Sequence, residues 1–148
     1  SDVNSVSTLC RSRHLHNWRQ LMRPKPIKVK PLLIFGRDGY RCALCAQVFQ
    51  DGQLVPHHRA NRGHGGSPVS DRPSNILSLC GLCNGLIESD AVEAGKARLL
   101  GIKISRFDAQ IAHLTPVKMF VESEREWVLL DDSYGATLTQ DPDEGLSE

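Results

Sequence analysis

Cys42-Ala43-Leu44-Cys45 and Cys80-Gly81-Leu82-Cys83 are the two stretches that decide the fold of this chain. In each, two thiols are separated by two residues, the spacing at which both can bind one metal ion. Four thiolates in two close pairs make a closed tetrahedral zinc site, which stabilises a fold and leaves no open position for chemistry. We therefore expect one structural zinc ion, with the ligands Cys42, Cys45, Cys80 and Cys83.

The two pairs are separated by the 34 residues 46–79, which is a longer insert than a simple zinc ribbon has. Such an insert has to fold as a hairpin and a loop between the two pairs. With a helix after the second pair, this order is typical of a treble-clef-like arrangement. The alternative is that the four cysteines are unligated buried thiols, but core packing alone rarely produces two Cys-x-x-Cys pairs.

Length and composition are those of one domain of 148 residues, with extended arms. The zinc unit is small, so the metal rather than the size of the core is expected to supply much of the folding energy. The sequence has no run of 18 or more apolar residues and no signal-peptide pattern, which indicates a soluble, cytoplasmic protein without a membrane partner. In that reducing compartment, Cys-x-x-Cys pairs favour metal over disulfide.

The charge of the chain is unevenly distributed although its net value is only +1. Residues 1–63 hold eleven Lys and Arg against three Asp and Glu, whereas residues 64–148 hold seven against fourteen. Such asymmetry hints that the basic half contacts nucleic acid. The alternative is a solvated basic arm and an acidic tail that keep the protein in solution.

Local patterns predict an α+β fold with short elements. Proline at 31 suits the first turn of a helix, and Gly101 suits the end of one. The predicted helices cover residues 32–35 and 84–99, the predicted strands cover 53–58, 76–79, 102–107, 117–121 and 127–130, and residues 59–74 form a loop. We divide the chain into a basic flexible arm (1–30), a metal-stabilised core (31–105), a C-terminal β extension containing a hairpin (106–132) and an acidic disordered tail (133–148).

Polar residues between and after the cysteine pairs are free for another role. His57-His58 closes the first predicted strand, and Asn75 and Asn84 flank the second cysteine pair, so these groups are expected around one pocket. Adjacent strand residues face opposite sides, so the two histidines can share a site only if the strand ends or bulges there. The residues alone do not decide which histidine would act as a base. The alternative is that they are surface histidines beside the zinc site.

The same residues carry a resemblance to a known family. The motifs that support it are Arg37-Asp38-Gly39-Tyr40-Arg41-Cys42-Ala43-Leu44-Cys45, His57-His58-Arg59, Asn75-Ile76-Leu77-Ser78-Leu79-Cys80 and Cys83-Asn84. Over residues 31–105 the chain resembles the HNH endonuclease superfamily, whose core is the ββα-metal motif. The stretch HHRANRGHGGS, residues 57–67, is also similar to the HHRxxRGxGGS segment of HNH nucleases carried by phages of actinobacteria.

The resemblance implies a role for each polar residue. His58 takes the position of the general base that activates water, and Asn75 takes that of the asparagine that braces the loop and orients the base. His57 takes a divalent-metal position. Asn84 takes the last metal position, where the family commonly has His. Because an amide oxygen is a harder ligand than imidazole, Asn84 favours Mg²⁺ or Mn²⁺ over Zn²⁺ at this second site.

The implied activity is metal-dependent hydrolysis of phosphodiester bonds in DNA, by nicking or double-strand cleavage, without a small-molecule cofactor. The phage-type resemblance further implies a role in genome processing or packaging, with terminase or packaging proteins as partners. Four arginines could bind DNA phosphates near the cut or simply be solvated: Arg37, Arg41, Arg59 and Arg62. The alternative function is a non-catalytic zinc module that binds nucleic acid or a protein.

Overall fold

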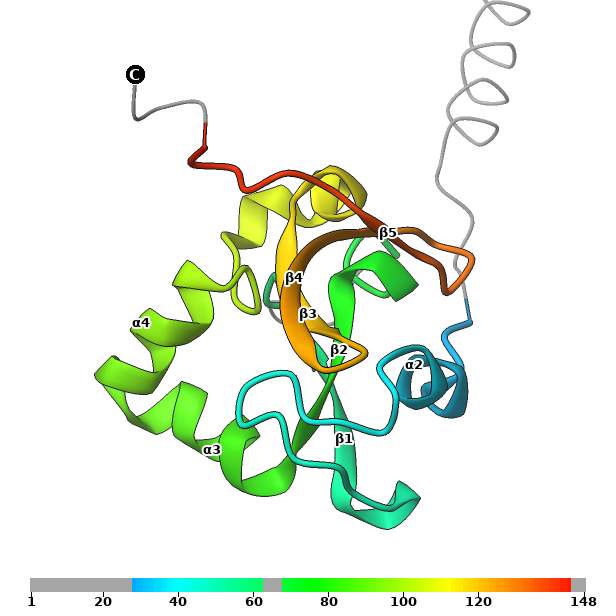
Figure 1. Cartoon of the computed structure of the whole chain (residues 1–148), viewed down its shortest axis with the longest axis vertical. Helices are drawn as coiled ribbons and strands as arrows, with labels where there is room; N and C mark the ends of the chain where they lie inside the picture. The colour runs from blue at the N-terminus through cyan, green and yellow to red at the C-terminus, as the bar shows by residue number, and fades with distance from the viewer. Residues whose placement is uncertain (1–27, 63–67, 145–148) are drawn as a thin grey trace, which may run out of the picture.

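The computed structural model describes residues 28–62 and 68–144. These residues form an α+β fold with two small antiparallel sheets and short helices (Figure 1). The expected basic arm, apart from residues 28–30, lies outside the described residues. No helix within the described ranges has the length and apolar character needed to cross a membrane.

The first sheet is a hairpin of β1 (Leu54–His58) and β2 (Ile76–Cys80), as the sequence predicted. Its register pairs Leu54 with Cys80 and His58 with Ile76. Helix α3 (Gly81–Ser89) follows β2 without a connecting loop, because the Cys80 sulfur accepts a hydrogen bond from the Cys83 N–H at 3.4 Å and caps the helix. The second cysteine pair therefore also starts the helix.

Residues 84–99 were predicted as one helix, which is wrong at Asp90. That residue has an extended backbone, with φ −123° and ψ 119°, and ends α3. Its Oδ1 accepts hydrogen bonds from the N–H groups of Val92 at 2.8 Å and Glu93 at 3.3 Å, so it is the N-cap of α4 (Ala91–Leu99). The break turns α4 back beside α3 (Figure 1).

Gly101 lies just beyond the end of α4, as expected, with φ at +75°. A Cβ atom on this residue would lie 2.3 Å from the Pro116 carbonyl oxygen. Glycine is therefore required here both for its left-handed backbone and for the close approach of the next segment.

The predicted strand at 102–107 is absent, and that prediction is wrong. The Ile102 N–H bonds to the Ala97 carbonyl at 2.8 Å and the Ile104 N–H to the Arg59 carbonyl at 3.0 Å, so the segment has no strand partner. A 3₁₀ segment, η3 (Arg106–Leu114), follows instead. Two small residues, Ala109 and Ala112, form its buried side.

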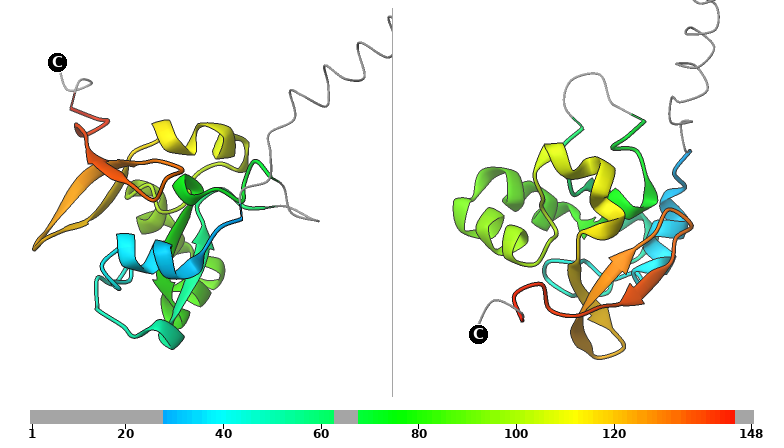
Figure 2. Two further views of the ribbon diagram at one scale, coloured as in Figure 1. Left: turned by 90° about the vertical axis from the view of Figure 1, so that its right-hand side faces the viewer. Right: turned by 90° about the horizontal axis from the view of Figure 1, so that it is seen from above.

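The second sheet contains the predicted hairpin, formed by β3 (Val117–Val121) and β4 (Glu124–Leu130). A third strand, β5 (Ala136–Leu138), pairs with β4 (Figure 2). The expectation that the chain is disordered from residue 133 is therefore wrong for this segment. Asp131 Oδ1 accepts hydrogen bonds from the Ser133 and Gly135 N–H groups, both at 2.8 Å, and shapes the turn that returns β5 to the sheet.

The main hydrophobic core joins the cysteine pairs to both sheets. Its buried members include Cys42, Leu77, Leu79, Cys80, Cys83, Ile87, Ile102, Val117, Val128 and Leu130. A smaller cluster forms where helix α2 (Pro31–Arg37) packs on the first hairpin; it contains Ile34, Phe35, Leu54 and Ile76. Two short 3₁₀ turns, η1 (Asp51–Gln53) and η2 (Pro73–Asn75), precede β1 and β2. Cys42, Cys80 and Cys83 are thus at the centre of the fold.

Candidate functional site

The four cysteines of the two Cys-x-x-Cys pairs lie together in one cluster. Their sulfur atoms all lie within 4.8 Å of one another, and three of the four residues are buried, Cys45 being the exposed one. Tetrahedral zinc with Zn–S bonds of about 2.3 Å requires sulfur atoms about 3.8 Å apart. The cluster therefore fits a metal ion such as zinc after a small contraction.

The electrostatics of the thiols also suit a cation. Burial acts to raise the pKa of Cys42, but backbone N–H groups of Cys45, Cys80 and Leu44 donate to its sulfur and lower the pKa overall. Burial raises the pKa of Cys45 and of Cys83. Without a positive charge these thiols resist ionisation together, so a metal ion in their midst would stabilise the thiolates.

His57 is buried, with 5% of its surface exposed, on the side of β1 that faces α3. Burial lowers its pKa, against the opposing effects of the Asn84 side chain, the Ile102 backbone and the negative charge of Glu88. The ring is therefore neutral near pH 7. Its Nε2 is buried and has no hydrogen-bond partner among the described residues. A neutral imidazole nitrogen without a protein partner is suited to metal binding.

His58 ends β1 and contacts a different group. Its Nε2 lies 2.8 Å from Asp71 Oδ1, and Arg62 Nε lies 3.2 Å from the same oxygen. The side chains of His58 and Asp71 are 20% and 34% exposed. A carboxylate accepts hydrogen bonds, so this contact places the ring proton on Nε2 and the lone pair on Nδ1. The described residues provide no hydrogen-bond partner for Nδ1.

Asn75 is fully buried and holds together the two ends of the loop that carries Asp71. Its Oδ1 accepts from the Ala60 N–H at 2.9 Å. Its Nδ2 donates to the Ala60 carbonyl at 3.2 Å and to the Ser70 carbonyl at 2.9 Å. The Asn75 amide thereby positions Asp71, which follows Ser70 in the chain and is the partner of His58.

The contacts divide the expected site residues into two groups. His57 lies with Asn84 near Glu88, whereas His58 lies with Asp71, and the two groups flank the end of β1. This follows from the alternation of side chains along a strand. Within the described ranges, no hydrogen bond or ion pair connects His58 to Asn84 or Glu88.

Two of the four arginines considered for DNA binding lie inside the protein. Arg59 has no exposed surface, and Arg37 has a side chain that is 3% exposed and paired with Asp38 at 2.7 Å. Burial lowers the pKa of Arg59 to about 10. The Arg59 guanidinium donates to the carbonyls of Gly101 (2.9 Å), Ser74 (3.0 Å), Ala112 (3.0 Å), Thr115 (2.8 Å) and Pro116 (3.2 Å). A phosphate cannot reach these buried guanidinium groups, so the expectation is corrected for both residues.

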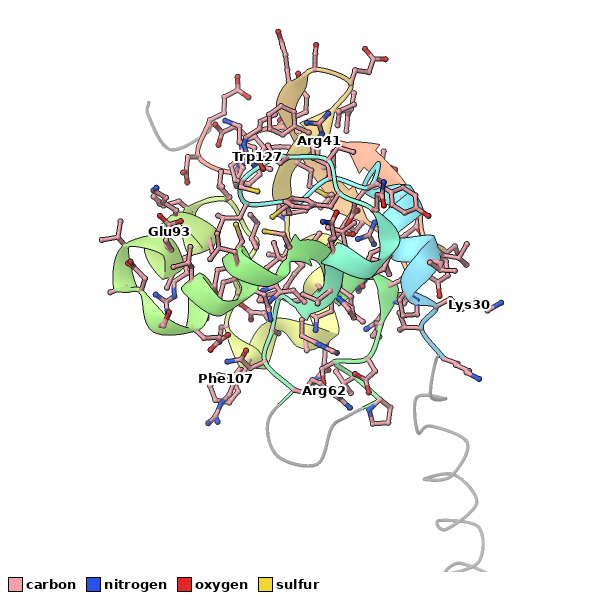
Figure 3. All side chains as sticks on the ribbon, turned by 90° about the horizontal axis from the view of Figure 1, so that it is seen from below. Lys30, Arg41, Arg62, Glu93, Phe107 and Trp127 are labelled. Atoms are coloured by element: carbon pink, nitrogen blue, oxygen red, sulfur yellow. The ribbon has the colours of Figure 1, made fainter. Side chains whose placement is uncertain are left out.

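The other two arginines are on opposite sides of the molecule (Figure 3). Arg41 is half-buried, donates to the Ala46 carbonyl and lies 5.0 Å from the ring centre of Phe120. Arg62 has a side chain that is 51% exposed and lies next to Asp71. Of the four, Arg62 is the one with an accessible guanidinium beside the His58 group.

The sequence did not predict two residues that contact these sites, Asp71 and Arg125. Asp71 lies in a loop rich in Gly, Pro and Ser, and no motif distinguishes it from other loop carboxylates. Arg125 lies on β4 and binds the first cysteine pair from 81 residues away. The sequence has no signal for either contact, because each depends on how distant segments pack.

In comparisons with protein-family models, curated proteins and solved structures, nothing matches this chain. The functional proposal therefore rests on its own residues and contacts and on the resemblance of its motifs.

Proposed function

We propose that this protein is a metal-dependent HNH-type DNA endonuclease, with β1, β2 and α3 as its ββα-metal core. The observation that carries the proposal is the pairing of His58 with Asp71 at the end of β1. One ring nitrogen is oriented by a carboxylate, and the other is left with a lone pair. This is the arrangement that a general base requires.

In the proposed reaction His58 accepts a proton from water as the water oxygen attacks the phosphorus of a phosphodiester. The bond from phosphorus to the leaving oxygen breaks, and that oxygen takes a proton from solvent. The proton goes to Nδ1, and Asp71 stabilises the resulting imidazolium through Nε2. Asn75 contributes by keeping the Asp71 loop in place. Both His58 and Asp71 are partly exposed, so water can reach the pair.

His57 and Asn84 would hold the second metal ion, Mg²⁺ or Mn²⁺, with Glu88 one helical turn further along α3 as an additional oxygen donor. The buried Nε2 of His57, for which the described residues supply no hydrogen-bond partner, fits this role, as does the nearby Asn84 amide. When bound there, the cation would supply positive charge to the phosphate and to the leaving oxygen. Because His57 and Asn84 lie on the other side of the strand end from Asp71, a cation held by them would leave His58 free of metal contact.

We also propose that the four cysteines bind Zn²⁺ for structural purposes. DNA is the proposed substrate, with Arg62 as the exposed phosphate contact near His58. The phage-type motifs support a role in genome processing or packaging within a bacterial host cell, alongside terminase or other packaging proteins.

The test is nicking of supercoiled plasmid in the presence of Mg²⁺, Mn²⁺ or EDTA. We expect cleavage with either metal, none with EDTA, and a loss of about 10²–10⁴-fold in the His58→Ala variant. His113→Ala is the matched control and should cleave at the wild-type rate, because within the described residues no hydrogen bond or ion pair connects His113 to His58, Asp71 or Asn84. Equal cleavage by wild type and His58→Ala would rule out His58 as the base.

The second candidate is a zinc module that binds a protein partner without catalysis. It is favoured by apolar residues beside the two cysteine pairs, where Leu82 and Leu99 are 73% and 79% exposed. These line a groove together with Leu44, Leu86 and Leu100. Absence of cleavage by zinc-loaded, folded protein with every divalent metal tested would favour this candidate over the nuclease.

A further inference from the structure

Arg125 reaches from β4 of the second sheet to the backbone of the first cysteine pair. Its Nη1 donates to the Ala43 carbonyl at 3.0 Å and its Nη2 to the Leu44 carbonyl at 2.8 Å. The guanidinium is half-buried and is also held by the Lys118 carbonyl at 3.2 Å. A side chain of the C-terminal hairpin therefore engages two successive peptide groups between Cys42 and Cys45.

The N–H ends of the same two peptide groups face the Cys42 sulfur. The carbonyl of Ala43 shares a peptide group with the N–H of Leu44, and the carbonyl of Leu44 shares one with the N–H of Cys45. Both of these N–H groups donate to Cys42. Each peptide thus links the guanidinium to the thiol, and hydrogen bonds in such a chain polarise and strengthen one another.

A second guanidinium supports the same loop. Arg41 donates to the Ala46 carbonyl, just after Cys45. Arg41 and Arg125 each lie 5.0 Å from the ring centre of Phe120, which fixes both of them. Figure 3 shows Arg41 at the β3–β4 hairpin. Two positive charges therefore lie beside the knuckle, where four thiolates around one zinc ion leave a net negative charge.

We propose that Arg125 is a positioning residue of the zinc site, which aims the Leu44 and Cys45 N–H groups at Cys42 and offsets the negative charge of the thiolates. This role rests on the zinc ion of the proposed function and is independent of nuclease activity. It also implies that the C-terminal hairpin helps to retain the metal. Negative charge on Cys42 and Cys45 acts on Arg125 in return, opposing the lowering of its pKa by burial.

The test uses the full chain and measures zinc directly. Elemental analysis of the purified protein first establishes one zinc per chain, and transfer of zinc to a coloured chelator then gives the rate of release. We expect Arg125→Met to release zinc roughly 10–100-fold faster, the size of effect usual for removing a residue that orients a metal ligand. Arg98→Met, which removes an exposed arginine of α4, should match the wild type.

A third variant separates loss of the contact from general weakening of the sheet. Val128→Ala leaves Arg125 in place but creates a cavity in β4, where Val128 is 2% exposed. At an equal loss of melting temperature, Arg125→Met should release zinc faster than Val128→Ala, and equal release by the two would overturn the proposal. If Arg125→Met does not fold, Arg125→Lys serves instead: faster release than wild type supports the proposal, and unchanged release overturns it.

The outcomes also distinguish this inference from the zinc proposal itself. If the wild type contains no zinc and binds none, the zinc site fails and the role of Arg125 fails with it. If the wild type holds zinc and Arg125→Met releases it at the rate of Arg98→Met, the role of Arg125 alone is overturned.

Discussion

Asp71 Oδ1 lies 2.8 Å from Nε2 of His58, a contact between a loop carboxylate and the last residue of a strand. The contact selects one tautomer of the imidazole and directs Nδ1 away from the carboxylate. Asn75 holds the ends of the loop, so the geometry of the pair depends on a buried amide rather than on the exposed loop itself.

Asp71→Asn should slow plasmid nicking, because the amide lacks the negative charge that stabilises protonated His58. The reduction should not exceed the about 10²–10⁴-fold that general-base catalysis contributes. The measurement is the single-turnover nicking rate, with His58→Ala as the lower reference. Asp108→Asn, on η3, is the control and should retain the wild-type rate. A wild-type rate for Asp71→Asn would remove Asp71 from the mechanism.

Asn75→Ala should destabilise the protein by about 2–3 kcal/mol, because it removes three buried hydrogen bonds between the Asn75 amide and the backbone of Ala60 and Ser70. Urea unfolding followed by circular dichroism measures the loss. Asn61→Ala removes an exposed amide from the same loop and should change the unfolding free energy by less than about 0.5 kcal/mol. Equal stability of the two variants would contradict the bracing role.

Arg59→Met should lower the free energy of unfolding by about 3 kcal/mol or more. Methionine has a similar length but cannot donate, so five carbonyls lose a partner in the interior. The same unfolding experiment measures it, and Arg62→Met is the matched control on an exposed arginine three residues later. A loss as small as that of Arg62→Met would mean that water replaces the guanidinium in the core.

Removal of zinc by a strong chelator should unfold the described core. A structural zinc contributes about 10–16 kcal/mol in small zinc modules, which is as large as the whole stability of a typical domain, about 5–15 kcal/mol. Because Cys42, Cys80 and Cys83 share one core with Val117 and Val128, both sheets should unfold in a single transition and refold when zinc is returned. Hydrogen exchange resolves the two sheets, and retention of the second sheet without metal would contradict the shared core.

The hydrogen bonds of Asp132 with Arg72 and Ser74, at the start of η2, should make the free energy of unfolding depend on pH in the acid range. Burial acts to raise the pKa of Asp132, but hydrogen bonds from Arg72 and Ser74 outweigh it and lower the pKa from its usual value of 3.8. A carboxyl group whose pKa is lowered by folding stabilises the fold at every pH above its usual pKa. This contribution is lost as the pH falls through the pKa that the group has in the folded state.

The variant Asp132→Asn isolates this contribution. The difference in unfolding free energy between wild type and variant should be constant from about pH 8 to pH 5 and should shrink below about pH 4. Acid also protonates the cysteines, but that effect is common to both proteins and cancels in the difference. A difference that changes between pH 8 and pH 5 would assign the effect to another group.

Much of the secondary structure was predictable because it depends on local patterns. The two hairpins, the helix after Pro31 and the helix end at Gly101 follow from proline, glycine and apolar spacing. The break at Asp90 was missed, since a capping aspartate in a run of helix-forming residues is a weak signal. The strand predicted at 102–107 failed because Ile102 and Ile104 donate their N–H groups to the end of α4 and to Arg59 rather than to a strand, and Phe107 is 77% exposed.

The sequence by itself determined the convergence of four cysteines, because two Cys-x-x-Cys pairs followed by a helix leave few other ways to satisfy their thiols. It also identified the histidines and asparagines that surround the end of β1. Only the tertiary structure decided which arginines are buried and which carboxylate meets His58. Those contacts form between segments far apart in the chain, where burial and packing, rather than residue type, determine the partner of each charge.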